Sequence, residues 1–185
     1  MALLIGRLLA ALLLATATAT YAGAQAVFSP AAPTEYEVKA AFLYNFARFV
    51  EWPSDAPRAE PFVIAILGRD PFGSVLDETV SGKAVAGRPI HVKRASRVDE
   101  VLDAQIVFVA ASENKDVQAI LRALDRPGVL TVGEVEGFAE QGGAINFTVQ
   151  SRRVRFEINP TQAEQAHLKM SSQLLKLATL VAPRR

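Results

Sequence analysis

The sequence lacks cysteine and has few of the other residues that often carry reactive chemistry: its 185 residues include 2 histidines, 2 methionines and 1 tryptophan. Without cysteine the chain forms no disulfide, offers no thiolate to a metal or a substrate, and has no site for a thiol-linked lipid. His91 and His167 fall on different predicted elements, without the spacing of paired metal ligands. We therefore expect a domain that is stable by packing alone and uses no metal or cofactor.

Sequence motifs typical of enzymes are also missing. The segment 67–70, LGRD, has neither the glycine pattern of a dinucleotide site nor the lysine of a phosphate-binding loop. No GxSxG segment is present, and Ser171-Ser172 lies in a helical pattern with apolar neighbours. Asp70 precedes a proline, which is typical of a helix cap rather than of a catalytic acid. We therefore predict that the protein is not an enzyme.

Residues 1–26 have the composition of a cleavable secretory signal peptide. Arg7 is the only charged residue there, an apolar run covers 8–15, and small residues suit cleavage after Ala24 or Ala26. The apolar run is shorter than the roughly 20 residues that a membrane-spanning helix requires. We expect residues 27–33 to be a tether and residues 34–182 to form a single exported domain.

The charges of the chain are balanced. It has 20 basic and 19 acidic residues, and loss of the predicted leader would remove Arg7, which leaves the two signs equal. Proteins that bind nucleic acid usually concentrate positive charge on one face. We therefore expect no nucleic acid partner.

Strand and helix patterns alternate along most of the domain. Strands are predicted at 62–67, 88–93, 106–110 and 129–132, and helices between them from 70 to about 80 and from 113 to 124. Residues 144–149 and 153–158 are separated by three residues, which predicts an antiparallel hairpin. Asn159-Pro160 is a helix start, and the helix is expected to reach about Leu180. The pattern predicts a three-layer α/β/α sandwich with a mostly parallel sheet of about six strands, the C-terminal hairpin and a long C-terminal helix.

The stretch 36–53, YEVKAAFLYNFARFVEWP, predicts a helix with unusually little polar surface. Thr34 and Glu37 have the spacing of a capping box, which fixes the start. Four side chains are expected to meet water, namely Glu37, Lys39, Arg48 and Glu51. We interpret the helix as covered on one side by its own domain and on another by a partner or by a second copy in a homodimer. Loss of the dimer in Leu43→Asp or Tyr44→Asp, with the fold intact, would support the homodimer. Candidate partner-binding residues are Tyr44, Asn45 and Trp52, although Tyr44 and Trp52 also suit a core and Asn45 a local backbone bond.

Four separated blocks of the chain resemble the YfiR-like family of periplasmic regulatory proteins: 36–53, 142–147 (GGAINF), 154–159 (VRFEIN) and 171–178 (SSQLLKLA). The resemblance covers essentially all of residues 34–182. It implies a non-enzymatic repressor in the periplasm that binds the periplasmic domain of an inner-membrane diguanylate cyclase, lowers cyclic-di-GMP output, and is sequestered by an outer-membrane lipoprotein. Some members carry disulfides, so redox control known for them does not transfer to this chain, which has no cysteine.

A row of charges on the last predicted strand is the second candidate binding site. Arg153, Arg155 and Glu157 alternate with apolar residues, so they share one face of the strand. The row is either a solvated face of the sheet or a binding site for a partner or a small anionic ligand. The second alternative is chemically reasonable because two neighbouring arginines can bind a carboxylate through paired hydrogen bonds. A periplasmic small-ligand receptor, or a modulator of a sensor histidine kinase, is therefore the alternative to a repressor of a diguanylate cyclase.

Overall fold

A computed structural model describes residues 32–53 and 61–184. The predicted signal peptide, most of the tether and the loop 54–60 lie outside the described residues. The elements, in chain order, are α1 (Glu35–Phe49), β1 (Val50–Glu51), β2 (Phe62–Leu67), α2 (Val75–Val80), β3 (Ala84–Val85), β4 (Arg88–Ala95), the 3-10 helix η1 (Val98–Val101), β5 (Ile106–Val109), the 3-10 helix η2 (Ala111–Asp116), α3 (Val117–Leu124), β6 (Leu130–Gly133), β7 (Ile145–Gln150), β8 (Arg153–Ile158), α4 (Pro160–Gln165), β9 (Lys169–Met170), α5 (Ser172–Leu177) and β10 (Thr179–Leu180).

The first helix starts at the predicted capping box. The Thr34 hydroxyl accepts a hydrogen bond from the Glu37 amide at 3.3 Å, and the Thr34 amide donates to the Glu37 carboxylate at 2.6 Å. Both bonds satisfy amides that the helix itself leaves unpaired. The helix ends where Val50 turns to an extended conformation and enters β1. The predicted start of α1 is thus confirmed.

Within residues 32–53 and 61–184, the main sheet has eight strands in the order β10-β8-β7-β6-β5-β2-β4-β3. Five neighbouring pairs are parallel, and only β7–β8 and β3–β4 are antiparallel. The α/β class, the mostly parallel sheet and the C-terminal hairpin are therefore confirmed. The count exceeds the six expected because β3 and β10 are edge strands of two residues each, too short to leave a sequence pattern.

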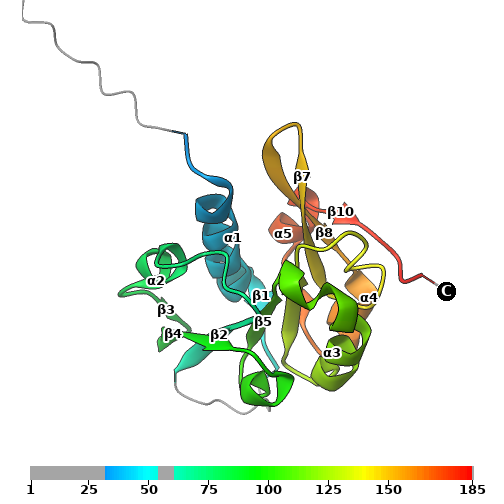
Figure 1. The fold of residues 1–185 in the computed structure, drawn as a ribbon, viewed down its shortest axis with the longest axis horizontal. Helices are drawn as coiled ribbons and strands as arrows, with labels where there is room; N and C mark the ends of the chain where they lie inside the picture. The colour runs from blue at the N-terminus through cyan, green and yellow to red at the C-terminus, as the bar shows by residue number, and fades with distance from the viewer. Residues whose placement is uncertain (1–31, 54–60, 185) are drawn as a thin grey trace, which may run out of the picture. The chain divides into compact units, whose positions relative to one another are not determined.

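Helices cover both faces of this sheet (Figure 1). One core, which contains Phe46, Leu76 and Leu174, packs α1, α2 and α5 against the first face. A second core, which contains Val101, Leu121 and Phe138, packs η1, α3 and the loop after β6 against the other. The central strands β2, β5 and β6 are buried along their whole length, as expected for strands covered on both sides.

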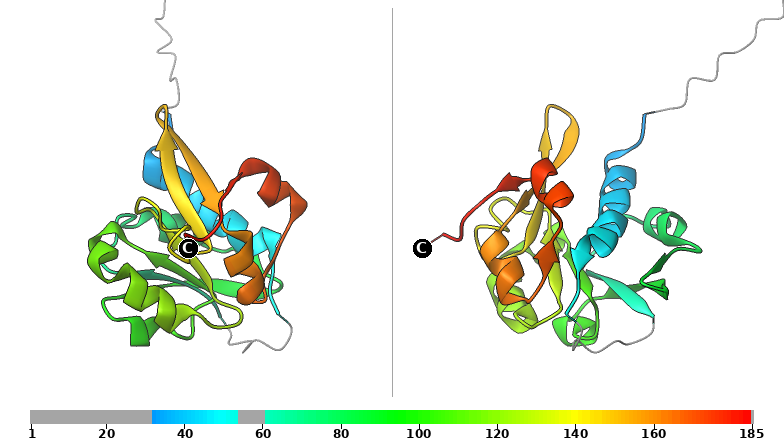
Figure 2. Two further views of the ribbon diagram at one scale, coloured as in Figure 1. Left: turned by 90° about the vertical axis from the view of Figure 1, so that its right-hand side faces the viewer. Right: turned by 180° about the vertical axis from the view of Figure 1, so that it is seen from behind.

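The β7–β8 hairpin projects beyond the rest of the sheet, as both views in Figure 2 show. β6 pairs only with Ile145 and Asn146 of β7, and β10 pairs only with Glu157 and Ile158 of β8. The outer half of the hairpin is therefore held by its own ladder and by what packs on its faces. This half lies next to the first two turns of α1.

The predicted long C-terminal helix is wrong. The chain 160–180 folds instead into α4, β9, α5 and β10. α4 ends at Gln165, and His167, two residues later, has a φ of 57°. The amides of His167 and Leu168 donate to the carbonyls of Glu164 and Ala163, which are the two hydrogen bonds of a Schellman motif. The sequence pattern does not indicate this break, because glycine, the usual residue with a positive φ after a helix, is absent at position 167. Leu177, an apolar residue of α5, is 67% exposed.

Two other helices start later than predicted. Asp70 does not cap a helix at Pro71; its carboxylate accepts from the Phe72 amide at 2.7 Å in a local turn, and α2 begins at Val75. α3 begins at Val117, because the preceding residues form the 3-10 helix η2 rather than the first turn of an α-helix. Both differences concern helix ends, where turns and 3-10 geometry compete with the α-helix.

Candidate functional site

α1 and the β7–β8 hairpin enclose two neighbouring hollows that share Glu35 and Val149 as lining residues. The first, here named the inner hollow, has a volume of about 390 Å³ and is lined by Glu35, Tyr36, Lys39, Ala111, Glu134, Glu136, Asn146, Phe147, Thr148 and Val149. The second, here named the arginine groove, has a volume of about 540 Å³ and is lined by Pro33, Glu35, Val38, Phe42, Val149, Arg152, Arg153, Val154 and Arg155. Ligand sites in proteins usually have volumes in this range.

The inner hollow is built around a buried ion pair. The ammonium of Lys39 lies 2.8 Å from the Glu134 carboxylate and 2.5 Å from that of Glu35. The Lys39 side chain is 4% exposed and that of Glu134 is 8% exposed. The Tyr36 hydroxyl donates to Glu134 at 3.4 Å, and the Lys39 ammonium lies 4.7 Å from the centre of the Tyr36 ring. This cluster ties α1 to the carboxyl end of β6.

The cluster shifts the pKa of two of its members. Burial alone lowers the pKa of Lys39, but the hydrogen bonds to Glu134 and Glu35 outweigh it, so the pKa is raised. The pKa of Tyr36 is raised by burial and by the negative charge of Glu134. At neutral pH the lysine is therefore charged and the tyrosine is protonated.

The prediction that Lys39 meets water is wrong, and the cluster was missed as a site. Periodicity counts lysine as polar wherever it falls, although its stem and its ammonium can both be buried against a carboxylate. Two signals were available. Lys39 follows Glu35 by four residues, the spacing of a helical ion pair, and Glu134 comes directly after the buried strand β6.

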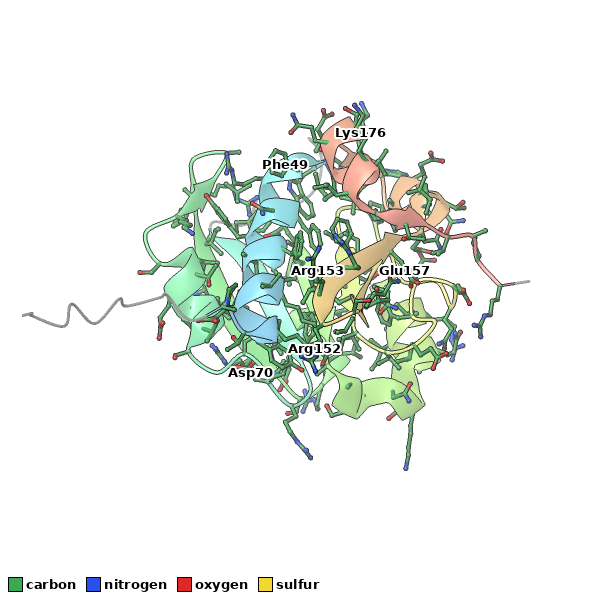
Figure 3. All side chains as sticks on the ribbon, turned by 90° about the horizontal axis from the view of Figure 1, so that it is seen from above. Phe49, Asp70, Arg152, Arg153, Glu157 and Lys176 are labelled. Atoms are coloured by element: carbon green, nitrogen blue, oxygen red, sulfur yellow. The ribbon has the colours of Figure 1, made fainter. Side chains whose placement is uncertain are left out.

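The arginine groove has apolar walls and a cationic rim. Val38 and Phe42 of α1 face Val154 of the hairpin across it, and Val149 at the rim is 52% exposed. The rim arginines are all exposed. Figure 3 shows α1 lying between the α2 region and the hairpin that carries Arg152 and Arg153.

The turn at the tip of the hairpin is strained. Ser151 and Arg152 have φ of 49° and 61°, in the left-handed region that favours glycine or asparagine. Such a two-residue turn matches the twist of the strands, but a branched or long side chain in this region costs energy. The turn places Arg152 at the tip of the hairpin, between the two strands. Residues with a strained backbone are often found at functional sites.

The structure separates the three predicted residues of β8. Arg153 and Arg155 are exposed and line the arginine groove. Glu157 is half-buried, lies beside β10, and accepts a hydrogen bond from the Asn146 amide at 3.1 Å. Its role as a binding residue stays a prediction, but its carboxylate already has a partner inside the sheet.

The candidate residues predicted in the stretch 36–53 do not line the arginine groove. Tyr44 packs beside Lys83, whose ammonium lies 4.4 Å from the ring centre, and Asn45 is half-buried. Trp52 packs edge-on to Phe62, with ring centres 5.1 Å apart, and donates to the Ala47 carbonyl at 3.1 Å. These contacts fit the interpretation of both aromatic residues as part of the fold.

The proposed dimer residue Leu43 is fully buried within its own domain. Leu43→Asp would therefore damage the core and would not report on a dimer. α1 is covered by α2 on one side and by β8 and α5 on the other, so its small polar surface needs no second copy. The homodimer stays a prediction without support from this helix.

Among residues 32–53 and 61–184, no helix is long and apolar enough to cross a membrane. Within the same ranges, no three His, Asp or Glu side chains are grouped so that they could hold a metal ion.

A family model described as YfiR/HmsC-like matches residues 36–179. The chain is similar to the crystal structure of a conserved domain protein from Vibrio cholerae O1 biovar eltor, with a TM-score of 0.54 and 11% identity over 80% of this chain and 60% of that one. It is also similar to the ABC domain from Streptococcus pneumonia in complex with L-Trp, with a TM-score of 0.43 and 11% identity over 65% and 55% of the two chains. The chain thus spans less than two thirds of either protein, and the first likeness concerns the fold alone. No curated protein matches the chain.

Proposed function

Because the chain belongs to the YfiR/HmsC-like family, we propose that it is a periplasmic regulatory protein that binds and represses the sensor domain of an inner-membrane signalling protein. The proposed target is a diguanylate cyclase, so that binding lowers cyclic-di-GMP output, and an outer-membrane lipoprotein is the proposed antagonist. The family match over residues 36–179 carries the proposal, since the family supports a regulatory role in general. Repression of this kind requires no chemistry by the chain itself.

The arginine groove supports a role in binding. It combines apolar walls with exposed cationic groups at its rim, and charges at the rim of an interface speed association and favour partners of opposite charge. Arginine is also favoured over lysine in interfaces, because its planar guanidinium can bind a carboxylate through two hydrogen bonds. The matching surface on the partner is expected to be acidic.

Repression follows from a difference in affinity between two states of the partner. A protein that binds the inactive conformation of a sensor domain more tightly than the active one shifts the equilibrium by that difference in binding free energy. The groove is held by the sheet and by α1, so the repressor needs no large change of its own.

A binding experiment with matched charge changes tests the proposal. The exported chain is immobilised, and detergent-solubilised membranes of the source cell, or the purified periplasmic domain of a candidate diguanylate cyclase, are passed over it. Arg153→Glu with Arg155→Glu is expected to weaken binding at least about tenfold, with most of the loss in the association rate. Lys115→Glu with Arg122→Glu makes the same change of charge at exposed positions on η2 and α3, and is expected to bind as the wild type does.

The cellular readout separates binding from repression. Deletion of the gene for this chain is expected to raise the cellular level of cyclic-di-GMP, and expression of the wild type is expected to return it to the original level. The hairpin variant, Arg153→Glu with Arg155→Glu, is expected to leave the level high although it is exported and folded. Unchanged cyclic-di-GMP in the deletion strain would remove the cyclase as the target. Equal affinity of the hairpin variant and the wild type for the captured partner would remove the arginine groove as the binding surface.

A further inference from the structure

We propose that the inner hollow binds a small organic cation, a primary ammonium whose N–H groups are donated to the carboxylates and amide oxygen around it. The inference is independent of repression, because it concerns a different hollow and needs no protein partner. It rests on the charge of the lining and on the unpaired buried acceptors beside it.

The lining of the hollow carries more negative than positive charge. Glu35, Glu134 and Glu136 line it together with one basic residue, Lys39. That lysine is already paired with two of the three carboxylates. An anion that entered would meet no free cation among the lining residues, whereas a cation would meet the carboxylate of Glu136 and the second carboxylate oxygen of Glu35.

Two buried polar atoms of the lining residues have no hydrogen-bond partner. They are the amide oxygen of Asn146 and the hydroxyl of Thr148. Asn146 is 1% exposed, and its amide nitrogen donates to Glu157, which leaves its oxygen as an acceptor. Buried acceptors without a partner are rare and costly, so their presence beside a hollow points to a donor that arrives with a ligand.

The hollow already holds one ammonium between aromatic rings. The Lys39 ammonium lies 4.7 Å from the ring centre of Tyr36 and 5.9 Å from that of Phe147. Ring faces attract cations, and the effect strengthens when water is excluded. Lys39 occupies this position and Phe147 is 2% exposed, so a second ammonium would bind through the carboxylates and the unpaired acceptors instead. The volume of about 390 Å³ accommodates an ammonium with a short hydrocarbon body.

A titration followed by amide chemical shifts tests the proposal with isosteric probes. Uniformly ¹⁵N-labelled exported chain is titrated with n-propylammonium chloride, with sodium propionate and with tetramethylammonium chloride at constant ionic strength. The expected result is saturable shifts at residues 134–136 and 146–148 with the propylammonium alone, at a dissociation constant of about 1 mM, as expected for so small a ligand. Tetramethylammonium carries the charge but no N–H donor, so it separates hydrogen bonding from simple attraction.

Two variants remove either a negative charge or a hydroxyl from the lining without disturbing the ion pair. Glu136→Gln, at an exposed residue, and Thr148→Val, which keeps the shape, are each expected to weaken binding of propylammonium about tenfold. Glu164→Gln, on the exposed surface of α4, is the control and is expected to change nothing. Equal shifts with propionate, unsaturable shifts with propylammonium, or unchanged affinity in both variants would each overturn the proposal. None of these results bears on the repression experiment.

Discussion

Replacement of Lys39 by methionine is the sharpest test of the buried ion pair. The change keeps most of the side-chain length but leaves Glu134, 8% exposed, with the Tyr36 hydroxyl at 3.4 Å as its remaining partner. Loss of one member of a buried pair typically costs 3–5 kcal/mol, and the residual exposure and this weak hydrogen bond favour the lower end, about 3 kcal/mol. For a domain of this size that corresponds to a fall in Tm of about 6–12 °C.

Glu134→Met and the double variant, measured together with Lys39→Met, give the coupling energy between Lys39 and Glu134. Glu134→Met is expected to cost less, about 2 kcal/mol, because Lys39 keeps Glu35 at 2.5 Å. The double variant, which replaces the pair by two apolar side chains, is expected to lie within about 1 kcal/mol of the wild type. Urea unfolding of the four proteins then gives a coupling of at least about 4 kcal/mol, because the two single losses sum to about 5 kcal/mol and the double variant loses at most about 1 kcal/mol. The exposed pair Arg97–Asp99 provides the control cycle, where no measurable coupling is expected.

The pH dependence has a definite sign. The pKa of Lys39 is raised in the folded state, so its stabilising effect is fully present below the unfolded value of about 10.4 and is lost as the pH rises through the folded value. The stability gap between wild type and Lys39→Met should stay constant from about pH 7 to about pH 9 and narrow above about pH 10.4. A gap of less than about 0.5 kcal/mol at neutral pH would refute the reasoning, because it would mean that Glu134 needs no partner.

Three other changes test separate parts of the fold. Phe46→Ala removes a fully buried ring 5.2 Å from that of Phe156 and should cost about 3–5 kcal/mol in urea unfolding. Arg152→Gly relieves a φ of 61° and should raise stability by about 0.5–1 kcal/mol while it weakens partner binding, so a lower Tm would contradict the strain. The hydrogen bond from Arg94 lowers the pKa of Asp77, so the stability that this ion pair contributes is present above about pH 3.9 and is lost as the pH falls through the lower folded pKa. Asp77→Asn should therefore make thermal unfolding less sensitive to acid. The effect should be less than about 1 kcal/mol, because the carboxylate is nearly half exposed.

Sequence patterns predicted the parts of the fold whose causes are local. β2 could be placed at 62–67 because all six residues are apolar, which is typical of a strand covered on both faces. In the structure all six are buried. The capping box at Thr34 depends on residues three apart, and the hairpin depends on a short connection between two alternating strands. In each case the residues that decide the structure are neighbours in sequence.

What could not be predicted depends on residues far apart or on backbone shape. Lys39 and Glu134 are 95 positions apart, and nothing in α1 alone shows that its lysine points to the end of β6. The break at His167 depends on a positive φ, which is uncommon for residues other than glycine and which no sequence pattern here indicates. The arginines of β8 were predicted as binding residues, but the walls of their groove come from Val38 and Phe42 on a helix that the pattern did not align with the hairpin.

The small sheet of β1 and β9 fixes one end of α1 more firmly than the other. Val50 and Glu51 pair with Met170 and Lys169, and the Ser171 amide donates to the Phe49 carbonyl at 3.0 Å, so the C-terminal end is anchored by main-chain bonds. The opposite end is attached to the sheet through side chains, chiefly Lys39 and Tyr36. Glu35 lies at this second end and lines both hollows. A substitution that changes how the first turn of α1 packs would therefore alter both hollows together.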